Sequence, residues 1–124
     1  MRADRPVHFN LLKIRLPVGA SVSILHRLSG AVLALAVPAL LYALMLSLRS
    51  QADFDRLAGF LDGGLGYLLM LGAIWAGAHH LLAGLRHLGF DLGWGLQRAP
   101  ARQTAAACLI LGVGLTGAVA LWIW

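Results

Sequence analysis

The run LSGAVLALAVPALLYALMLSL, from Leu28 to Leu48, contains no charged residue. Two runs of the same kind follow it, from Gly63 to Leu85 and from Thr104 to Trp124. As an α-helix, each run is about 31 to 35 Å long at about 1.5 Å per residue. The hydrocarbon core of a bilayer is about 30 Å thick, and a segment that crosses it must satisfy its own backbone hydrogen bonds. The three runs therefore predict three transmembrane helices.

The composition supports the membrane class. Of the 124 residues, 60% are hydrophobic and only 12% are charged, with a mean hydropathy of +0.79. Soluble domains are about one quarter charged, so this chain has too little polar sequence to cover three buried helices. The single cysteine, Cys108, lies inside the third run and excludes an intramolecular disulfide. We expect an all-α membrane protein.

The chain divides at its charged residues. The expected organisation is a leader over residues 1–20, transmembrane helices over 21–48, 63–88 and 104–124, and loops over 49–62 and 89–103. Within the leader, Val7 to Leu16 is too short to span and is expected to lie along the interface. Trp122 and Trp124 stand where an interfacial aromatic anchor is expected.

The distribution of basic residues predicts the orientation. Eight of the ten arginines and lysines lie in the leader, at the start of the first helix or around the second loop. The first loop has only Arg49 and Arg56. The positive-inside rule therefore places the N-terminus and the 89–103 loop in the cytoplasm, and the 49–62 loop and the C-terminus in the periplasm. The net charge of +5 then indicates topology and headgroup contacts rather than nucleic-acid binding.

One face of the first helix gathers polar groups. Four residues at positions i, i+3, i+4 and i+7 share that face: Ser23, His26, Arg27 and Gly30. A hydroxyl, an imidazole and a guanidinium that converge at the membrane edge could bind a polar headgroup or an anion. Alternatively, His26 and Arg27 only mark the boundary and extend to water.

The second helix carries a matching face: His80, Gly84, His87 and Asp91. His80 lies six residues before Arg86, so it is about 9 Å below the cytoplasmic edge. An imidazole at that depth needs a partner. Haem iron is one candidate, with Gly84 leaving room for a flat macrocycle, and a hydrogen bond across a helix interface is the other. His79 points about 100° away and is the weaker candidate.

The histidines of the two faces are not expected to form a pair. His26 is near the membrane edge, whereas His80 lies deeper, so a pair would have to bridge different depths. If a haem here is six-coordinate, its second ligand is expected from another subunit.

Two motifs carry a resemblance to a known family. SILHRLSG occupies Ser23 to Gly30, HLLAGLRHLGFD occupies His80 to Asp91, and Arg5-Pro6 opens the chain. With these motifs at this spacing, essentially the whole chain resembles the cytochrome b556 subunits of succinate dehydrogenase. Such a subunit is one of the two chains that form the membrane anchor of respiratory complex II.

The resemblance implies a role for most of these residues. His80 matches the axial ligand of haem b, so it would bind the haem iron, and the companion anchor subunit would supply the other axial histidine. Ser23 and Arg27 match residues that line the ubiquinone site. The expected vicinity of the haem propionates comprises His26, Arg27 and His87. Asp91 is expected to pair with a nearby arginine, and His79 matches no known role.

The resemblance also implies an assembly. The chain would anchor succinate dehydrogenase, a succinate:quinone oxidoreductase of the respiratory chain and tricarboxylic acid cycle, in a bacterial inner membrane. Its partners would be a flavoprotein, an iron–sulfur subunit and a second three-span anchor. The helices of that second anchor would pack with those of this chain into a helix bundle in the bilayer. The redox chemistry belongs to the cofactors, so no catalytic residue is assigned. A structural anchor without haem and a fumarate reductase anchor remain alternatives; a proton-relay transporter lacks the expected inverted repeat.

Overall fold

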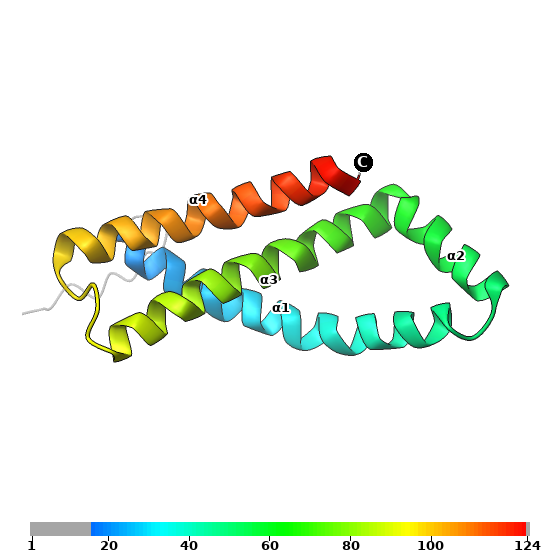
Figure 1. Ribbon diagram of the computed structural model, residues 1–124, viewed down its shortest axis with the longest axis horizontal. Helices are drawn as coiled ribbons and strands as arrows, with labels where there is room; N and C mark the ends of the chain where they lie inside the picture. The colour runs from blue at the N-terminus through cyan, green and yellow to red at the C-terminus, as the bar shows by residue number, and fades with distance from the viewer. Residues whose placement is uncertain (1–15, 124) are drawn as a thin grey trace, which may run out of the picture.

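The structure, a computed structural model, describes residues 16–123, and most of these lie in four helices (Figure 1). The helices are α1 (Val18–Ser47), α2 (Gln51–Asp62), α3 (Gly64–Asp91) and α4 (Arg98–Ile123). Three of them, α1, α3 and α4, are long and apolar enough to cross a membrane. The described residues contain no strand. The prediction of an all-α membrane protein with three spans is therefore confirmed.

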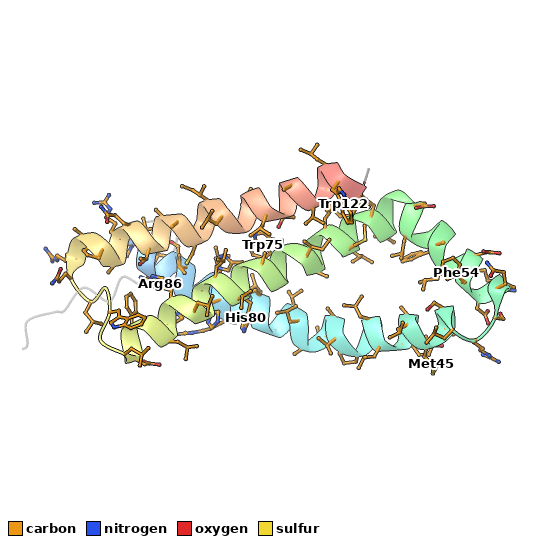
Figure 2. The ribbon with its side chains drawn as sticks, in the orientation of Figure 1. Met45, Phe54, Trp75, His80, Arg86 and Trp122 are labelled. Carbon is orange, nitrogen blue, oxygen red and sulfur yellow. The ribbon has the colours of Figure 1, made fainter. Side chains whose placement is uncertain are left out.

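The predicted leader lies largely outside the described residues. The structure says nothing of residues 1–15, so the interfacial placement of Val7 to Leu16 stays a prediction. Trp124 is also outside the described range, and of the predicted aromatic anchor only Trp122 is described. It is 85% exposed at the end of α4 (Figure 2), as an anchor in the headgroup layer would be.

The three long helices form a bundle with a core of small side chains. α3 packs against both α1 and α4, and α1 also contacts α4. Figure 1 shows α1 crossing α3 and then separating from it toward α2. The buried core residues are small or medium in size: Val22, Ala76, Ala83, Ala105 and Cys108. Small side chains let helix backbones approach closely, which drives association in lipid where apolar burial does not.

The 49–62 connection, expected as a loop, is mostly the helix α2. Ser50 caps its start, because the Ser50 Oγ accepts a hydrogen bond from the Asp53 backbone N–H at 3.1 Å. Asp53 also pairs with Arg56 at 3.3 Å. No residue of α2 is buried. The Ser50–Asp53 spacing is the sequence signal of such a cap and could have revealed the helix.

The second connection is shorter than expected. α3 continues to Asp91 and α4 begins at Arg98, so only residues 92–97 lie outside the helices. α3 ends in a Schellman motif, in which the Trp94 N–H donates to the Gly89 carbonyl at 2.8 Å and the Gly93 N–H donates to the Phe90 carbonyl at 2.9 Å. Gly93 has a φ of 81°, a conformation that favours glycine.

Candidate functional site

Three histidines meet where α1 crosses α3, and we call them the histidine group: His26, His80 and His87. The rings of His26 and His80 are stacked, with centroids 4.1 Å apart and an interplanar angle of 18°. The centroids of His26 and His87 are 5.1 Å apart, at an angle of 46°. The two faces predicted from helical spacing, one on each helix, therefore face each other across the α1–α3 interface.

His80 lies beside α1 (Figure 2), and the backbone of that helix holds its ring. Its Nδ1 lies 3.0 Å from the His26 carbonyl oxygen. A carbonyl oxygen only accepts, so Nδ1 carries the proton and donates it. The Ser29 hydroxyl donates to the same carbonyl at 2.9 Å, and its oxygen lies 3.3 Å from Nδ1. Within the described residues, the His80 Nε2 makes no hydrogen bond, so its lone pair is available.

Two glycines admit the histidine rings. A Cβ at Gly30 would lie 3.0 Å from His80 Cε1, closer than a Cβ is normally found to any atom. A Cβ at Gly84 would lie 3.6 Å from His26 Nε2. Gly84 was expected to leave room for a macrocycle beside His80, but in this structure the His26 ring lies against it. The glycine that accommodates His80 is Gly30.

The expectation that His26 and His80 lie at different depths was wrong. α1 begins at Val18, so His26 is about 12 Å along it, and α3 extends about 16 Å beyond His80 to Asp91. At this end of the bundle, α1 begins three residues before its expected limit at residue 21, and α3 ends three residues after its expected limit at residue 88. Because α1 and α3 run in opposite directions, these lengths bring the two rings to the same level.

The two residues predicted to line a quinone site lie at the edge of this interface. Ser23 is half-buried and Arg27 is exposed. Neither side chain makes a hydrogen bond or an ion pair with another described residue. Their spacing keeps them on one face of α1, beside His26. The Arg27 guanidinium is therefore available to an anion, and the role of both residues stays a prediction.

A row of rings leads from His80 toward the α3–α4 connection. After His26 and His87 comes Phe90, whose ring stands edge-on to His87 with centroids 6.4 Å apart. The row thus contains rings from both helices and ends at the last turn of α3.

Asp91 forms no ion pair with a described arginine, and its expected pairing stays a prediction. Asp91 is exposed at the end of α3, and within residues 16–123 the single ion pair is the one between Arg56 and Asp53. The six-residue connection separates Asp91 from the arginines of α4, so their closeness in the sequence does not bring the carboxylate and a guanidinium into contact.

Arg86, which was expected only to mark the membrane edge, joins α3 to α4. Its Nε donates to the Thr104 Oγ1 at 3.1 Å and its Nη2 donates to the Ala101 carbonyl at 3.1 Å. Its guanidinium also lies 4.3 Å from the centre of the Phe90 ring. Arg86 therefore ties the first turns of α4 to the last turns of α3 (Figure 2). Arg86 stands next to His87 inside the second motif, and this position was the sequence feature that could have marked it as a site residue.

His79 faces away from the histidine group, as its position on the helix predicted. It is 1% exposed, and its ring stacks on Trp75 with centroids 5.4 Å apart. A Cβ at Gly112 would lie 3.5 Å from its side chain, so α4 closes over it. Neither ring nitrogen has a hydrogen-bond partner. His79 therefore packs between helices and presents no atom to the site at His80.

The described residues contain no group of three or more histidine, cysteine, aspartate or glutamate side chains that could hold a metal ion by themselves. In the histidine group, the rings of His26 and His80 are stacked face to face and the ring of His87 is tilted to that of His26. What this chain offers is one oriented imidazole, His80. A single imidazole nitrogen fits a prosthetic group that takes one ligand from this chain.

Comparison with known proteins finds similarity along essentially the whole length of the chain. Residues 1–119 match the family described as the succinate dehydrogenase/fumarate reductase transmembrane subunit. The chain is 33% identical to the succinate dehydrogenase cytochrome b556 subunit of Paracoccus denitrificans, over 87% of this chain and 83% of that one. It is 34% identical to the cytochrome b556 subunit of Coxiella burnetii, over 100% of both chains. Identity to the cytochrome b560 subunit of Reclinomonas americana is 30%, over 99% and 88%.

Proposed function

Because the chain belongs to the succinate dehydrogenase/fumarate reductase transmembrane subunit family and is a membrane-anchor subunit of succinate dehydrogenase, we propose that it holds haem b through His80 and contributes Ser23 and Arg27 to a ubiquinone-reduction site. The names of the relatives support a haem, since they are cytochromes b. The observation that carries the proposal is the orientation of His80, with Nδ1 bonded to the His26 carbonyl and Nε2 unpaired.

The environment of His80 is the one that a metal-bound histidine needs. Such a histidine donates its second ring N–H to a carbonyl or carboxylate, which selects the tautomer and fixes the ring. The His26 carbonyl and the Ser29 hydroxyl act in this way on Nδ1. When bound, haem iron supplies one-electron transfer, and this chain supplies the ligand and its orientation.

A second histidine ligand for the iron would come from a companion anchor subunit. His26 lies stacked against the face of the His80 ring, so it would not bind the same iron. His79 is enclosed between helices and has no access to the same space. The chain therefore holds one half of the ligand set.

The polar residues beside His80 suit the other parts of the proposed site. Propionates are anions, and the exposed guanidinium of Arg27 is a planar donor for carboxylates. His26 and His87 provide further ring N–H groups next to it. A quinone oxygen gains negative charge on reduction, so the Ser23 hydroxyl and Arg27 would stabilise it by donating hydrogen bonds.

We propose that the N-terminus and the α3–α4 connection face the cytoplasm and the C-terminus faces the periplasm of a bacterial inner membrane. The concentration of basic residues at that end of the bundle supports this orientation. A cytoplasmic site at His26 and Arg27 would adjoin an iron–sulfur subunit that receives electrons from a flavoprotein, and protons would come from water.

The test is the haem content of the purified complex carrying His80→Ala, measured as the pyridine haemochrome. We expect the haem to be lost, because no other imidazole among the described residues is oriented to replace it. The matched control is His79→Leu, which changes the adjacent histidine but keeps an apolar side chain in the packed space, and this variant should retain haem. If His80→Ala leaves the haem content and the absorption spectrum unchanged, the ligand assignment is wrong.

A second candidate function is a structural anchor that binds no haem. The Nδ1 of His80 is already satisfied across the α1–α3 interface, so this histidine has a packing role without any cofactor. This alternative predicts that the purified wild-type complex shows no haem absorption.

A further inference from the structure

The end of the bundle opposite the histidine group contains a pocket. It lies between α2, the first turns of α3 and the last turn of α4, and its volume is about 480 Å³. Figure 1 shows α2 joining the separated ends of α1 and α3, with the C-terminus near the start of α3. The size is within the range of small-molecule sites. Six residues line the pocket: Ala58, Leu61, Asp62, Tyr67, Met70 and Ile123.

The corner between α2 and α3 fixes the shape of this pocket. The Gly63 N–H donates to the Phe60 carbonyl at 3.1 Å, and the Gly63 carbonyl accepts from the Tyr67 N–H at 2.9 Å. A Cβ at Gly66 would overlap the Phe60 carbonyl, so the two helices touch through backbone atoms. Because the backbone on both sides is held in this way, the pocket is part of the fold and not a gap between loose segments.

The pocket extends from the headgroup layer into the hydrocarbon. Asp62 is the last charged residue before the uncharged run that starts at Gly63. A carboxylate in hydrocarbon is costly, so Asp62 lies at the polar edge of the membrane. α3 begins at Gly64, and Met70 is about 9 Å further along it, toward the bilayer centre. A ligand that fills the pocket therefore needs a polar end and an apolar part.

The charges at this end of the bundle indicate which polar end fits. Asp62 is exposed and makes no ion pair with a described residue. Arg56, the arginine of α2, is already paired with Asp53 at 3.3 Å. Among the described residues, the pocket lining thus contains one carboxylate and no cation. It attracts a cationic group and repels an anionic one.

We propose that this pocket binds a membrane phospholipid whose headgroup carries an amine, as that of phosphatidylethanolamine does. One acyl chain lies against Leu61, Met70 and Ile123, and the ammonium group donates to the Asp62 carboxylate. The proposal goes beyond the haem and quinone sites and rests on neither of them. It requires only that the chain crosses a membrane, whichever side this end of the bundle faces.

The first test uses vesicles that contain the purified complex and a phosphatidylethanolamine or a phosphatidylglycerol with a photoreactive diazirine in one acyl chain. After illumination, lipid adducts on residues 58–70 are measured by mass spectrometry of peptides. We expect more adducts from phosphatidylethanolamine. Asp62→Asn should lower them about twofold to fivefold, the scale of one partly exposed ion pair, and should not lower those from phosphatidylglycerol.

Asp55→Asn is the matched control for this test. Asp55 is exposed on the same helix, accepts a hydrogen bond from Gln51 at 2.8 Å, and does not line the pocket. Equal labelling by the two lipids, or an unchanged phosphatidylethanolamine signal in Asp62→Asn, overturns the proposal. So does a lack of lipid adducts on residues 58–70, which means that another subunit covers the pocket. If added ubiquinone removes the adducts, the occupant is a quinone and the proposal is wrong.

The second test fills the pocket. Ala58 is half-buried in its wall, and Ala58→Trp should lower labelling by phosphatidylethanolamine about fivefold or more, because overfilling a packed site is unfavourable on that scale. The control is Ala52→Trp on the same helix, whose side chain is exposed and outside the pocket. Size-exclusion chromatography checks that both complexes are assembled. If the two assembled variants are labelled equally, the lipid does not occupy this pocket.

Discussion

Ser29 shows how one buried hydroxyl can orient the proposed ligand. It is fully buried, and its oxygen contacts both the His26 carbonyl and the His80 Nδ1. Gly30, the next residue, leaves the space into which the His80 ring fits. The two residues that end the first motif therefore hold His80 from one side, one through hydrogen bonds and one through the absence of a side chain.

Ser29→Ala should weaken haem retention about tenfold or more, because residues that hydrogen-bond a metal ligand affect affinity on that scale. The measurement is the rate at which the purified complex transfers haem to apomyoglobin. Ser47→Ala is the matched control, since the Ser47 hydroxyl also donates to the carbonyl three residues earlier, at 2.7 Å, but at an exposed position. Equal transfer rates for the two variants would show that Ser29 does not act on His80.

Gly30→Ala should displace the His80 ring, because the added methyl group would lie 3.0 Å from Cε1. We expect an altered haem spectrum and a loss of stability of about 1 to 3 kcal/mol, as for other overpacked interfaces. The measurement is the absorption spectrum and thermal denaturation of the purified complex. At Gly72 a Cβ meets nothing within 4 Å, so Gly72→Ala should leave both unchanged. Identical behaviour of the two variants would contradict the assignment.

At the scale of the helices, the end of the bundle near the histidine group depends on contacts between neighbouring elements. α3 is capped by the Schellman motif, and α4 is held to it by the two hydrogen bonds of Arg86. α1 begins close by, since a Cβ at Gly19 would lie 3.6 Å from the same guanidinium. Arg86 thus lies where all three long helices meet.

Arg86→Lys should loosen the first turns of α4, because an ammonium group cannot reproduce the planar fork that donates to Thr104 and Ala101 while lying over Phe90. Amide hydrogen exchange over residues 98–104 should become about tenfold or more faster, as expected for the loss of charged hydrogen bonds. The control is Arg102→Lys, which removes no hydrogen bond to a described residue. Unchanged exchange in the Arg86 variant would assign the stability of this end to other contacts.

At the scale of the whole molecule, the chain buries little of itself. Few of the described side chains are fully enclosed, and the long helices expose large apolar residues over most of their surface, for example Leu35 at 78% and Leu121 at 85%. In lipid such exposure carries no penalty, and it leaves helix faces available to other subunits. The molecule is thus organised as one part of a larger helix assembly, with the histidine group and most of the described basic residues toward one end of the bundle.

Much of this organisation is contained in the sequence. Helices are required wherever more than about 20 uncharged apolar residues cross lipid, because the backbone has no other hydrogen-bond partner there. The same reasoning identified the helix faces that carry His26 and His80, since helical spacing is a local property. Hydrophobic periodicity did not reveal α2, whose residues are polar enough to form either a loop or a helix, although the Ser50–Asp53 spacing was a local signal of its cap.

The contacts of the candidate site were decided only by the tertiary structure. The level of a side chain depends on where its helix begins and ends, and α1 begins before residue 21 and α3 ends after residue 88, the limits expected from the sequence. Their crossing brings His26 and Ser29 against His80, which lies 54 and 51 positions further along the chain. Charge patterns indicate which segments cross the membrane, whereas contacts between helices depend on packing, which no single segment encodes.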